Sequence, residues 1–327
     1  MALGSRHPSG TVVSRIRESV GSVVVGNEHA LELLLVALLC RGHALVEDVP
    51  GVGKTLLARS FARVLGCDFR RVQLTPDVMP SDITGSSVFN QATAGFEFRP
   101  GPVFTQVLLA DEVNRATPRT QSALLEAMEE RQVTIDGETR MLPEPFLVLA
   151  TQNPVELEGT FPLPEAQLDR FLVRVALGYP DRGEEHDILR RFERDDVPGL
   201  APVTDPAGLL ALQRQRADVV VGDDVLAYLL DVVRATREDD RLTLGASPRA
   251  ALALHRSCQA RALLDDRSYV LPDDVKALAV PVLAHRINLG ASARLRGTSA
   301  TGIVLEILER TVVPVEDEDE DEIGTGS

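Results

Sequence analysis

Residues 43–55 of the chain read HALVEDVPGVGKT, and this stretch decides how the rest of the sequence is interpreted. Its first part, His43–Glu47, is predicted to form a short buried strand, and a turn rich in proline and glycine follows. An apolar helix then begins at Gly53-Lys54-Thr55. Small residues at such a turn let backbone N–H groups face a triphosphate at the N-terminus of a helix. The stretch therefore predicts a phosphate-binding loop.

The charge of Lys54 argues against an incidental surface turn. A cation in the first turn of a helix opposes the helix dipole, so a lysine there needs a negative ligand. We expect Lys54 to contact the β- and γ-phosphates and the Thr55 hydroxyl to bind Mg²⁺. The consensus of this loop begins with a glycine, and Asp48 takes that place here. The residues of the loop that are predicted to bind nucleotide are Pro50, Gly51, Val52, Gly53, Lys54, Thr55 and Leu56.

The chain has 327 residues, which is enough for about two domains. Its net charge of −15 is concentrated in Glu316–Glu322, an unbroken run of seven acids. Without those seven of the 49 acids, the remaining 42 face 34 bases, so the body is only mildly acidic. This balance argues against a nucleic-acid partner held mainly through its phosphates.

The sequence contains no pattern typical of a metal centre, a disulfide framework or a membrane span. Cys40, Cys67 and Cys258 are scattered without the spacing of metal ligands or disulfides. The longest apolar run, Ala30–Cys40, is too short to cross a bilayer and is interrupted by Glu32. The first residues lack the apolar core of a signal peptide. We therefore expect a cytoplasmic protein without direct membrane insertion.

Apolar strands alternate with helices in residues 11–178, which predicts an α/β domain with a five-stranded parallel sheet flanked by helices. The expected strands are His43–Glu47, Phe69–Leu74, Val107–Asp111, Phe146–Thr151 and Phe171–Leu177. The expected helices are Thr11–Val24, Glu28–Arg41, the helix that begins at Lys54, Thr117–Glu130 and Ala166–Phe171. Two hairpins are predicted in addition, one within Thr75–Gly101 and one at Val133–Met141, where Asp136-Gly137 suits a type I′ turn.

From Asp181 onward the pattern predicts only helices, so residues 179–314 are expected to form a smaller all-α domain after a hinge at Gly178–Pro180. These helices are Arg182–Phe192, Ala207–Arg216, Asp223–Arg237, Pro248–Leu264, Pro272–His285 and Thr301–Arg310. Residues 1–10 are polar and expected to be flexible. Residues 315–327 contain the acidic run and are expected to be a disordered tail, because like charges repel one another.

Three polar positions follow predicted strands, at the sheet edge where ligands of such folds bind. Asp111 and Glu112 end the apolar run LLADE, and successive side chains of a strand point to opposite faces. We expect Asp111 to bind Mg²⁺ together with Thr55, and Glu112 to orient and deprotonate the attacking water. Asn153, in ATQNP, is expected to hold that water or sense the γ-phosphate. The alternatives are a solvated strand end and an ordinary turn residue before proline.

Two arginines are further candidates. Arg170, in LDRF, ends a predicted helix, where a cation can also simply cap the helix. Arg249 follows Ser247 and Pro248, which are predicted to be the N-cap and the first residue of a helix. A cation at that place opposes the helix dipole, so we expect Arg249 to face an anion.

The motifs GVGKT, LLADE, ATQNP, LDRF and ASPR, in this order and with both hairpins, resemble the MoxR family of AAA+ ATPases. The stretches EDVPGVGKT, DEVNRATPRTQSALLEAMEERQVTIDG and QNPVELEGTFPLPEAQLDRF are very similar to that family's pattern. The resemblance covers residues 11–313. It implies an AAA+ module with a helical lid domain, and hydrolysis of ATP with Mg²⁺ in a homo-oligomeric ring, usually a hexamer.

The resemblance also implies roles for single residues. Arg170 matches the arginine finger that is supplied to the neighbour's ATP, Asn153 matches sensor 1, and Arg249 matches sensor 2. We expect Arg249 to contact the γ-phosphate across the hinge. The segment Val25–Asn27, which includes Val25 and Gly26, lies where the family's adenine contacts begin. The two hairpins match insertions that face the ring pore or a client.

The function implied by the resemblance is chaperone-like remodelling or activation of a protein partner, often one with a von Willebrand A domain. Two alternatives remain from the sequence. One is a chelatase-like motor subunit for metal insertion into a cofactor, and the other is a nucleotide-switched scaffold with incidental turnover. Turnover that rises when the partner is added distinguishes a motor from a scaffold.

Overall fold

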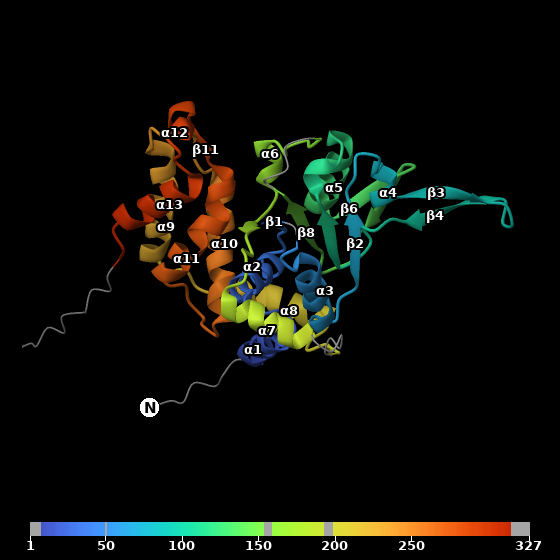
Figure 1. Cartoon of the computed structure of the whole chain (residues 1–327), viewed down its shortest axis with the longest axis horizontal. Helices are drawn as coiled ribbons and strands as arrows, with labels where there is room; N and C mark the ends of the chain where they lie inside the picture. Colours follow the sequence, from blue (N-terminus) through green and yellow to red (C-terminus); the bar gives the residue numbers. More distant parts are fainter. Residues whose placement is uncertain (1–7, 50, 154–158, 193–198, 315–327) are drawn as a thin grey trace, which may run out of the picture.

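The computed structural model describes residues 8–49, 51–153, 159–192 and 199–314. A five-stranded sheet with strand order β2-β5-β8-β1-β9 forms the centre of the N-terminal half, and all of its strand pairs are parallel (Figure 1). The strands are β1 (Ala44–Glu47), β2 (Phe69–Gln73), β5 (Val107–Asp111), β8 (Leu147–Gln152) and β9 (Val173–Val175). The predicted fold class is confirmed.

The two faces of the sheet are covered by different helices, as the alternation of side chains requires. Leu108 and Ala110 of β5 belong to the core formed with α5 (Pro118–Glu130). Val107 and Leu109 of the same strand face the other way and share a core with α2 (Glu28–Leu39) and α3 (Lys54–Val64). Both faces of the strand are therefore buried, which explains why its sequence is apolar throughout.

Several boundaries differ from those expected. Helix α1 (Pro8–Gly21) begins three residues early, so residues 8–10 belong to a helix and not to a flexible end. The last predicted strand, Phe171–Leu177, shortens to β9, and the short helix before it is α6 (Glu165–Leu168). Helix α4 (Pro80–Thr84) lies in a segment that was expected to contain only a hairpin.

Both predicted hairpins are present. Strands β3 (Gly85–Asn90) and β4 (Gly95–Pro100) pair antiparallel, and Figure 1 shows this hairpin extending away from the rest of the molecule. Strands β6 (Gln132–Ile135) and β7 (Glu138–Met141) form the second hairpin.

The C-terminal half is mainly helical, but the expectation that it contains only helices is wrong. Strands β10 (Leu242–Leu244) and β11 (Asn288–Leu289) form a small antiparallel ladder. Strands this short do not show the alternation by which a sequence reveals a strand. The helices are α7 (Arg182–Phe192), α8 (Pro206–Arg216), α9 (Asp223–Glu238), α10 (Pro248–Leu264), α11 (Pro272–Leu283), α12 (Ala291–Leu295) and α13 (Ala300–Arg310).

Helices of this half pack directly on the N-terminal half. Helix α10 contacts α1 and α2, and α8 contacts α2. Gln213 of α8 donates from Nε2 to the Leu38 carbonyl at 2.7 Å, and the backbone N–H of Val203 donates to the Val64 carbonyl at 2.7 Å. The domain boundary near Gly178 remains a prediction. The predictions for Pro50 and for residues 1–7 and 315–327 lie outside the described residues.

Candidate functional site

A cavity of about 300 Å³ lies at the carboxyl edge of the sheet, where β1, β5 and β8 end. Eight residues predicted to bind or hydrolyse a nucleotide line it together: Gly51, Gly53, Lys54, Thr55, Leu56, Asp111, Glu112 and Asn153. They come from three separate parts of the chain, and parallel pairing of the strands brings these parts to one edge. We call this space the phosphate cavity.

The loop at the start of α3 has the conformation that its glycines permit. Gly51 has φ of 90° and Gly53 has φ of 86°, in the left-handed region that residues with a Cβ rarely adopt. Helix α3 begins directly after Gly53, so its first N–H groups lie at the cavity. Lys54 donates from Nζ to the backbone carbonyl of Asp48 at 3.0 Å. The loop and its lysine are thus arranged for an anion.

Thr151 holds the two acidic residues in place, and sequence reasoning did not single it out. Its hydroxyl accepts the backbone N–H of Glu112 at 2.9 Å and donates to the Asp111 carboxylate. Glu112 itself has φ of 58°, which turns the chain sharply after β5. Its carboxylate is paired with Arg115 at 3.0 Å. The sequence contained a sign of this role. Thr151, in ATQNP, ends a predicted strand, and the end of LLADE was expected at the same edge of the sheet.

Arg71 is a second residue that sequence reasoning missed. It lies on β2, the edge strand beside β5, and lines the phosphate cavity. Its guanidinium binds the Asp111 carboxylate at 2.6 Å. The sequence contained a sign of this role, because Arg70 and Arg71 lie in a strand that was expected in a buried sheet. A charged side chain in such a strand needs a partner.

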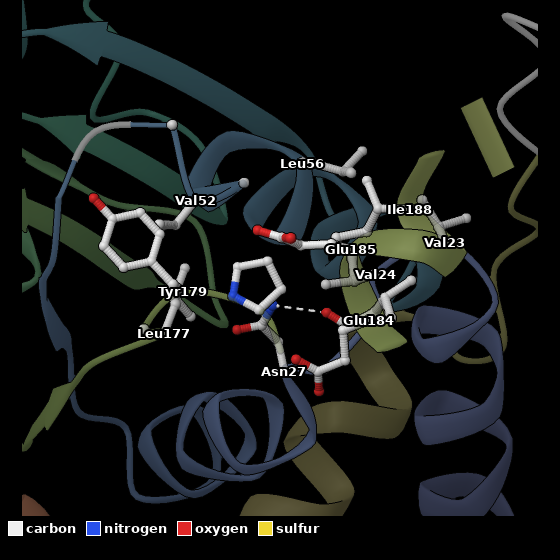
Figure 2. Close-up of a pocket in the computed structure, with 16 residues that line it drawn as sticks. Val23, Val24, Asn27, Val52, Leu56, Leu177, Tyr179, Glu184, Glu185 and Ile188 are labelled. Atoms are coloured by element: carbon white, nitrogen blue, oxygen red, sulfur yellow. Dashed lines mark hydrogen bonds between the residues drawn. The ribbon is translucent and has the colours of Figure 1, made fainter. Parts of the chain in front are cut away.

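A second cavity of about 320 Å³ adjoins the first and shares Gly51, Gly53 and Leu56 with it. Its walls are largely apolar, and they include Val52 together with Val25 and Gly26, the two residues for which adenine contacts were expected. Figure 2 shows Leu56, Leu177 and Ile188 around this space, with Glu184 and Glu185 of α7 beside them. We call it the base cavity, because a flat apolar ring fits such walls and phosphates do not.

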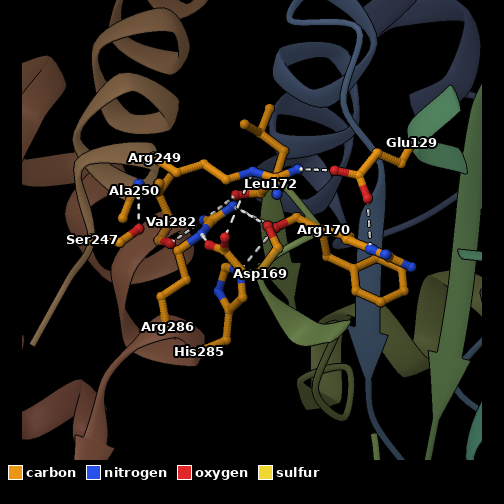
Figure 3. Close-up of polar contacts among 11 residues, drawn as sticks. Glu129, Asp169, Arg170, Leu172, Ser247, Arg249, Ala250, Val282, His285 and Arg286 are labelled. Carbon is orange, nitrogen blue, oxygen red and sulfur yellow. Dashed lines mark hydrogen bonds and ion pairs between the residues drawn. The ribbon is translucent and has the colours of Figure 1, made fainter. Parts of the chain in front are cut away.

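Arg170 and Arg249 lie at the opposite edge of the sheet. Arg170 comes shortly before β9 begins, so it lies at the amino edge, and Figure 3 shows both arginines turned toward Glu129. The Nε of Arg170 is 2.9 Å from Glu129 Oε2, and a terminal nitrogen of Arg249 is 3.2 Å from Oε1. Both arginines line a cavity of about 530 Å³ there, and neither is among the described residues that line the phosphate cavity.

The local structure around Arg249 is the predicted one, and within the chain Arg249 faces two carboxylates. Ser247 is the N-cap of α10, its hydroxyl accepts the Ala250 N–H at 3.2 Å, and Pro248 is the first helical residue. Arg249 faces Glu129 and Asp169 and is not among the described residues that line the phosphate cavity, so its expected contact with a γ-phosphate stays a prediction. The dipole argument correctly required an anion but could not identify it.

An ion pair between the buried Arg286 and the partly exposed Asp169 supports this amino edge. The Arg286 side chain is 4% exposed, binds Asp169 at 2.8 Å, and donates to the Leu172 and Phe171 carbonyls at 2.9 and 2.7 Å. Burial lowers the pKa of the Arg286 guanidinium, while Asp169 opposes that shift. Asp169 precedes Arg170 directly, so this network fixes the backbone from which Arg170 extends.

The donor set of the phosphate cavity fits Mg²⁺ bound together with phosphates. The described residues include no group of three or more His, Cys, Asp or Glu side chains that could hold a metal. Mg²⁺ at nucleotide sites needs only one or two protein oxygens, because phosphate and water oxygens supply the others. Thr55 and Asp111 both line the cavity and offer one hydroxyl and one carboxylate.

Within the described residues, no helix is both long and apolar enough to span a membrane.

Comparisons with known proteins identify the family of this chain. Residues 43–173 match the ATPase family associated with various cellular activities (AAA), and residues 234–307 match the AAA lid domain. The chain is 48% identical over 311 residues to the uncharacterized protein YeaC of Bacillus subtilis (strain 168), covering 95% of this chain and 96% of that protein. It is 42% identical over 304 residues to Chaperone MoxR1 of Mycobacterium tuberculosis, covering 90% and 80% of the two chains.

A third relative, Protein MoxR of Paracoccus denitrificans, is 31% identical over 321 residues, which cover 90% of this chain and 94% of that protein. Among solved structures, the crystal structure of an ATPase candidate from Cytophaga hutchinsonii superposes with a TM-score of 0.88 at 39% identity. The match covers 94% of this chain and 96% of that one.

Proposed function

The chain belongs to the MoxR family of AAA+ ATPases and is an ATP hydrolase, and from that premise we propose how its site works. ATP lies across the two cavities at the carboxyl edge, with adenine in the base cavity and the phosphates in the phosphate cavity. The observation that carries this proposal is that the cavities adjoin and share Gly51, Gly53 and Leu56. A single ligand with an apolar ring and a charged tail matches both spaces.

In this arrangement each polar residue has a separate task. Lys54 and the N–H groups at the start of α3 bind the phosphates. Thr55 and Asp111 hold Mg²⁺, which neutralises negative charge on the phosphates when it is bound. Glu112 takes a proton from the attacking water, and Asn153 orients that water beside the γ-phosphate. Arg71 and Thr151 keep the Asp111 carboxylate in position.

The site is completed by a second copy of the chain. Arg170 and Arg249 lie at the edge of the sheet opposite to their own phosphate cavity, so a large rearrangement would be needed to bring them to it. A head-to-tail contact between copies places one chain's amino edge against the next chain's carboxyl edge, and repetition of this contact closes a ring. Both arginines then serve the neighbour's ATP, and a hexamer is the proposed ring.

Hydrolysis is proposed to drive remodelling of a protein client in the cytoplasm, such as a protein with a von Willebrand A domain. The β3–β4 hairpin supports a client contact, because Phe89 and Phe96 at its end are 51% and 75% exposed. Their rings pack edge to face with centroids 5.4 Å apart. Exposed aromatic pairs of this kind mark protein-binding surfaces. The relative from Mycobacterium tuberculosis is named a chaperone.

Dilution tests the shared site directly. ATP turnover per chain, measured with Mg²⁺, should fall steeply below the concentration at which rings dissociate, as followed in parallel by analytical ultracentrifugation. Turnover should also be lost when EDTA removes Mg²⁺. A rate per chain that stays constant through dissociation would show that one copy holds a complete site.

A further inference from the structure

Asp48 stands where the phosphate-loop consensus has glycine, and its side chain makes contacts that a glycine cannot make. The residue is 8% exposed. One carboxylate oxygen accepts the Val49 N–H at 2.8 Å. The other accepts the N–H groups of Leu177 and Gly178 at 2.6 and 2.7 Å. Three backbone donors thus converge on one buried carboxylate.

These bonds join two segments that are far apart in the sequence. Asp48 directly follows β1 and begins the phosphate loop, whereas residues 177–180 connect β9 to α7. We call residues 177–180 the connector. All four connector residues line the base cavity. The hydrogen bonds from Leu177 and Gly178 to the Asp48 carboxylate therefore fix the position of one wall of that cavity.

The backbone of the same residue contacts the phosphate subsite. The Asp48 carbonyl accepts a hydrogen bond from Lys54 Nζ at 3.0 Å. An ammonium group has three N–H donors, so one bond to a fixed carbonyl leaves two for phosphate oxygens. The position of the lysine ammonium therefore depends on the position of Asp48, which depends on the connector.

We propose that Asp48 is a positioning residue that couples the phosphate subsite to the connector, so that phosphate binding at Lys54 orders the wall of the base cavity. The inference rests on the proposed placement of ATP across the two cavities. It also explains the departure from the glycine consensus, because a glycine would leave the N–H groups of Leu177 and Gly178 without this acceptor.

Asp48→Asn tests the coupling with little change in shape. An amide has one oxygen and one NH₂ group, so either Val49 or the Leu177 and Gly178 pair must then face a donor instead of an acceptor. Asp274→Asn is the matched control. The Asp274 side chain is 2% exposed and accepts the Leu271 N–H at 2.8 Å, but it lies on α11 and does not line either cavity.

The probe is tripolyphosphate with Mg²⁺, which fills the phosphate subsite and has no base, and the readout is amide hydrogen exchange. In the wild type, exchange should slow at residues 51–55 and also at Leu177 and Gly178. In Asp48→Asn the slowing at the connector should disappear, and the Kd for ATP should rise about tenfold, as expected for unpaired buried donors. Asp274→Asn should lose thermal stability but keep both responses.

Two results would overturn the inference, and only the second would overturn the proposed site as well. If tripolyphosphate slows exchange at residues 51–55 but leaves the wild-type connector unchanged, the site stands and the coupling through Asp48 is wrong. This comparison needs no variant, so it holds even where Asp48→Asn does not fold. If residues 51–55 do not respond at all, the proposed nucleotide site fails, and the inference fails with it.

Discussion

Arg170 and Arg249 bind the two oxygens of one carboxylate, that of Glu129, at 2.9 and 3.2 Å. The two arginines are 79 positions apart in the sequence and come from different halves of the molecule. Because they share one carboxylate, the two arginines lie close together, and both line the same cavity. A phosphate from a neighbouring copy offers both of them more negative charge than Glu129 does. The pair therefore acts as one unit in the proposed assembly.

Substitutions in the phosphate cavity should separate binding from chemistry. Lys54→Ala removes the cation that faces the phosphates, so ATP affinity should fall sharply. Glu112→Gln keeps the shape of the side chain but cannot take a proton, so ATP affinity should persist while turnover is lost. Isothermal titration with ATP and a phosphate-release assay measure the two quantities. Normal hydrolysis by Glu112→Gln would remove that carboxylate from the proposed mechanism.

Arg71 and Arg70 offer a matched pair of substitutions on one strand. Arg71 binds Asp111 and lines the phosphate cavity, whereas Arg70 points to the other face and donates to the Gly101 carbonyl at 3.2 Å. Arg71→Ala should reduce kcat/KM for ATP about tenfold, since a charge-assisted bond to the Mg²⁺-binding carboxylate is lost. Arg70→Ala should stay within about twofold of wild type. Equal effects in steady-state assays would show that Arg71 has only a structural role.

Arg249→Ala distinguishes a residue that serves its own site from one that serves a neighbour. In dilute single chains the Kd for ATP should be unchanged, because Arg249 does not line the phosphate cavity of the described chain. In assembled rings the same variant should lose most of its turnover. Fluorescent-nucleotide titrations below and above the assembly concentration give both values. Weaker binding by dilute chains would return Arg249 to its own active site.

Stability should fall as the pH drops below about 6.5, because two buried histidines are neutral in the folded chain. Burial lowers the pKa of His43 from 6.5 to about 3, aided by the nearby Arg131 charge, and burial lowers the pKa of His285 well below its usual value. The unfolded chain takes up these protons first, so their stabilisation is complete above pH 6.5. It is lost progressively as the pH falls toward the folded pKa, at up to about 1.4 kcal/mol per pH unit for each histidine.

His43→Gln isolates one of these contributions. His43 accepts the Val148 N–H at Nδ1 and contacts the Met128 carbonyl through Nε2, both at 3.0 Å, and a glutamine amide can also accept and donate. Urea unfolding between pH 5 and pH 7.5 should therefore show a shallower pH slope for the variant than for wild type. Identical slopes would mean that His43 does not resist protonation in the folded chain.

The sequence predicted the phosphate edge well because its information there is local. Each group of site residues directly follows an apolar run: the loop glycines and Lys54 come after His43–Glu47, and Asp111 and Glu112 come after Val107–Ala110. Parallel pairing brings such strand ends together. Contacts between distant segments were not readable in the same way. Arg71 reaches Asp111 only because β2 pairs with β5. Arg249 meets Glu129 only because α10 packs against α1 and α2 of the N-terminal half. The helix-dipole argument predicted that the partner of Arg249 carries a negative charge, but it did not identify that partner as Glu129.

The ladder of β10 and β11 was missed for a related reason. Three and two residues are too few to establish a period of two, so LTL resembled a loop between helices. The opposite case is Asp48, whose departure from the glycine consensus was visible in the sequence. Its partners Leu177 and Gly178 lie about 130 positions away, and only the structure shows them.

The measurement that tests the shared active site most directly is complementation between two inactive variants. Glu112→Gln retains Arg170 but cannot activate water, and Arg170→Ala retains Glu112 but lacks the arginine, which supplied in trans contributes roughly 10³ or more in rate. In an even mixture under conditions of subunit exchange, about a quarter of the head-to-tail interfaces should combine both intact residues. The account predicts an ATPase rate that peaks near equal mixing. A flat rate at every ratio, with exchange confirmed by fluorescence energy transfer between labelled copies, would contradict it.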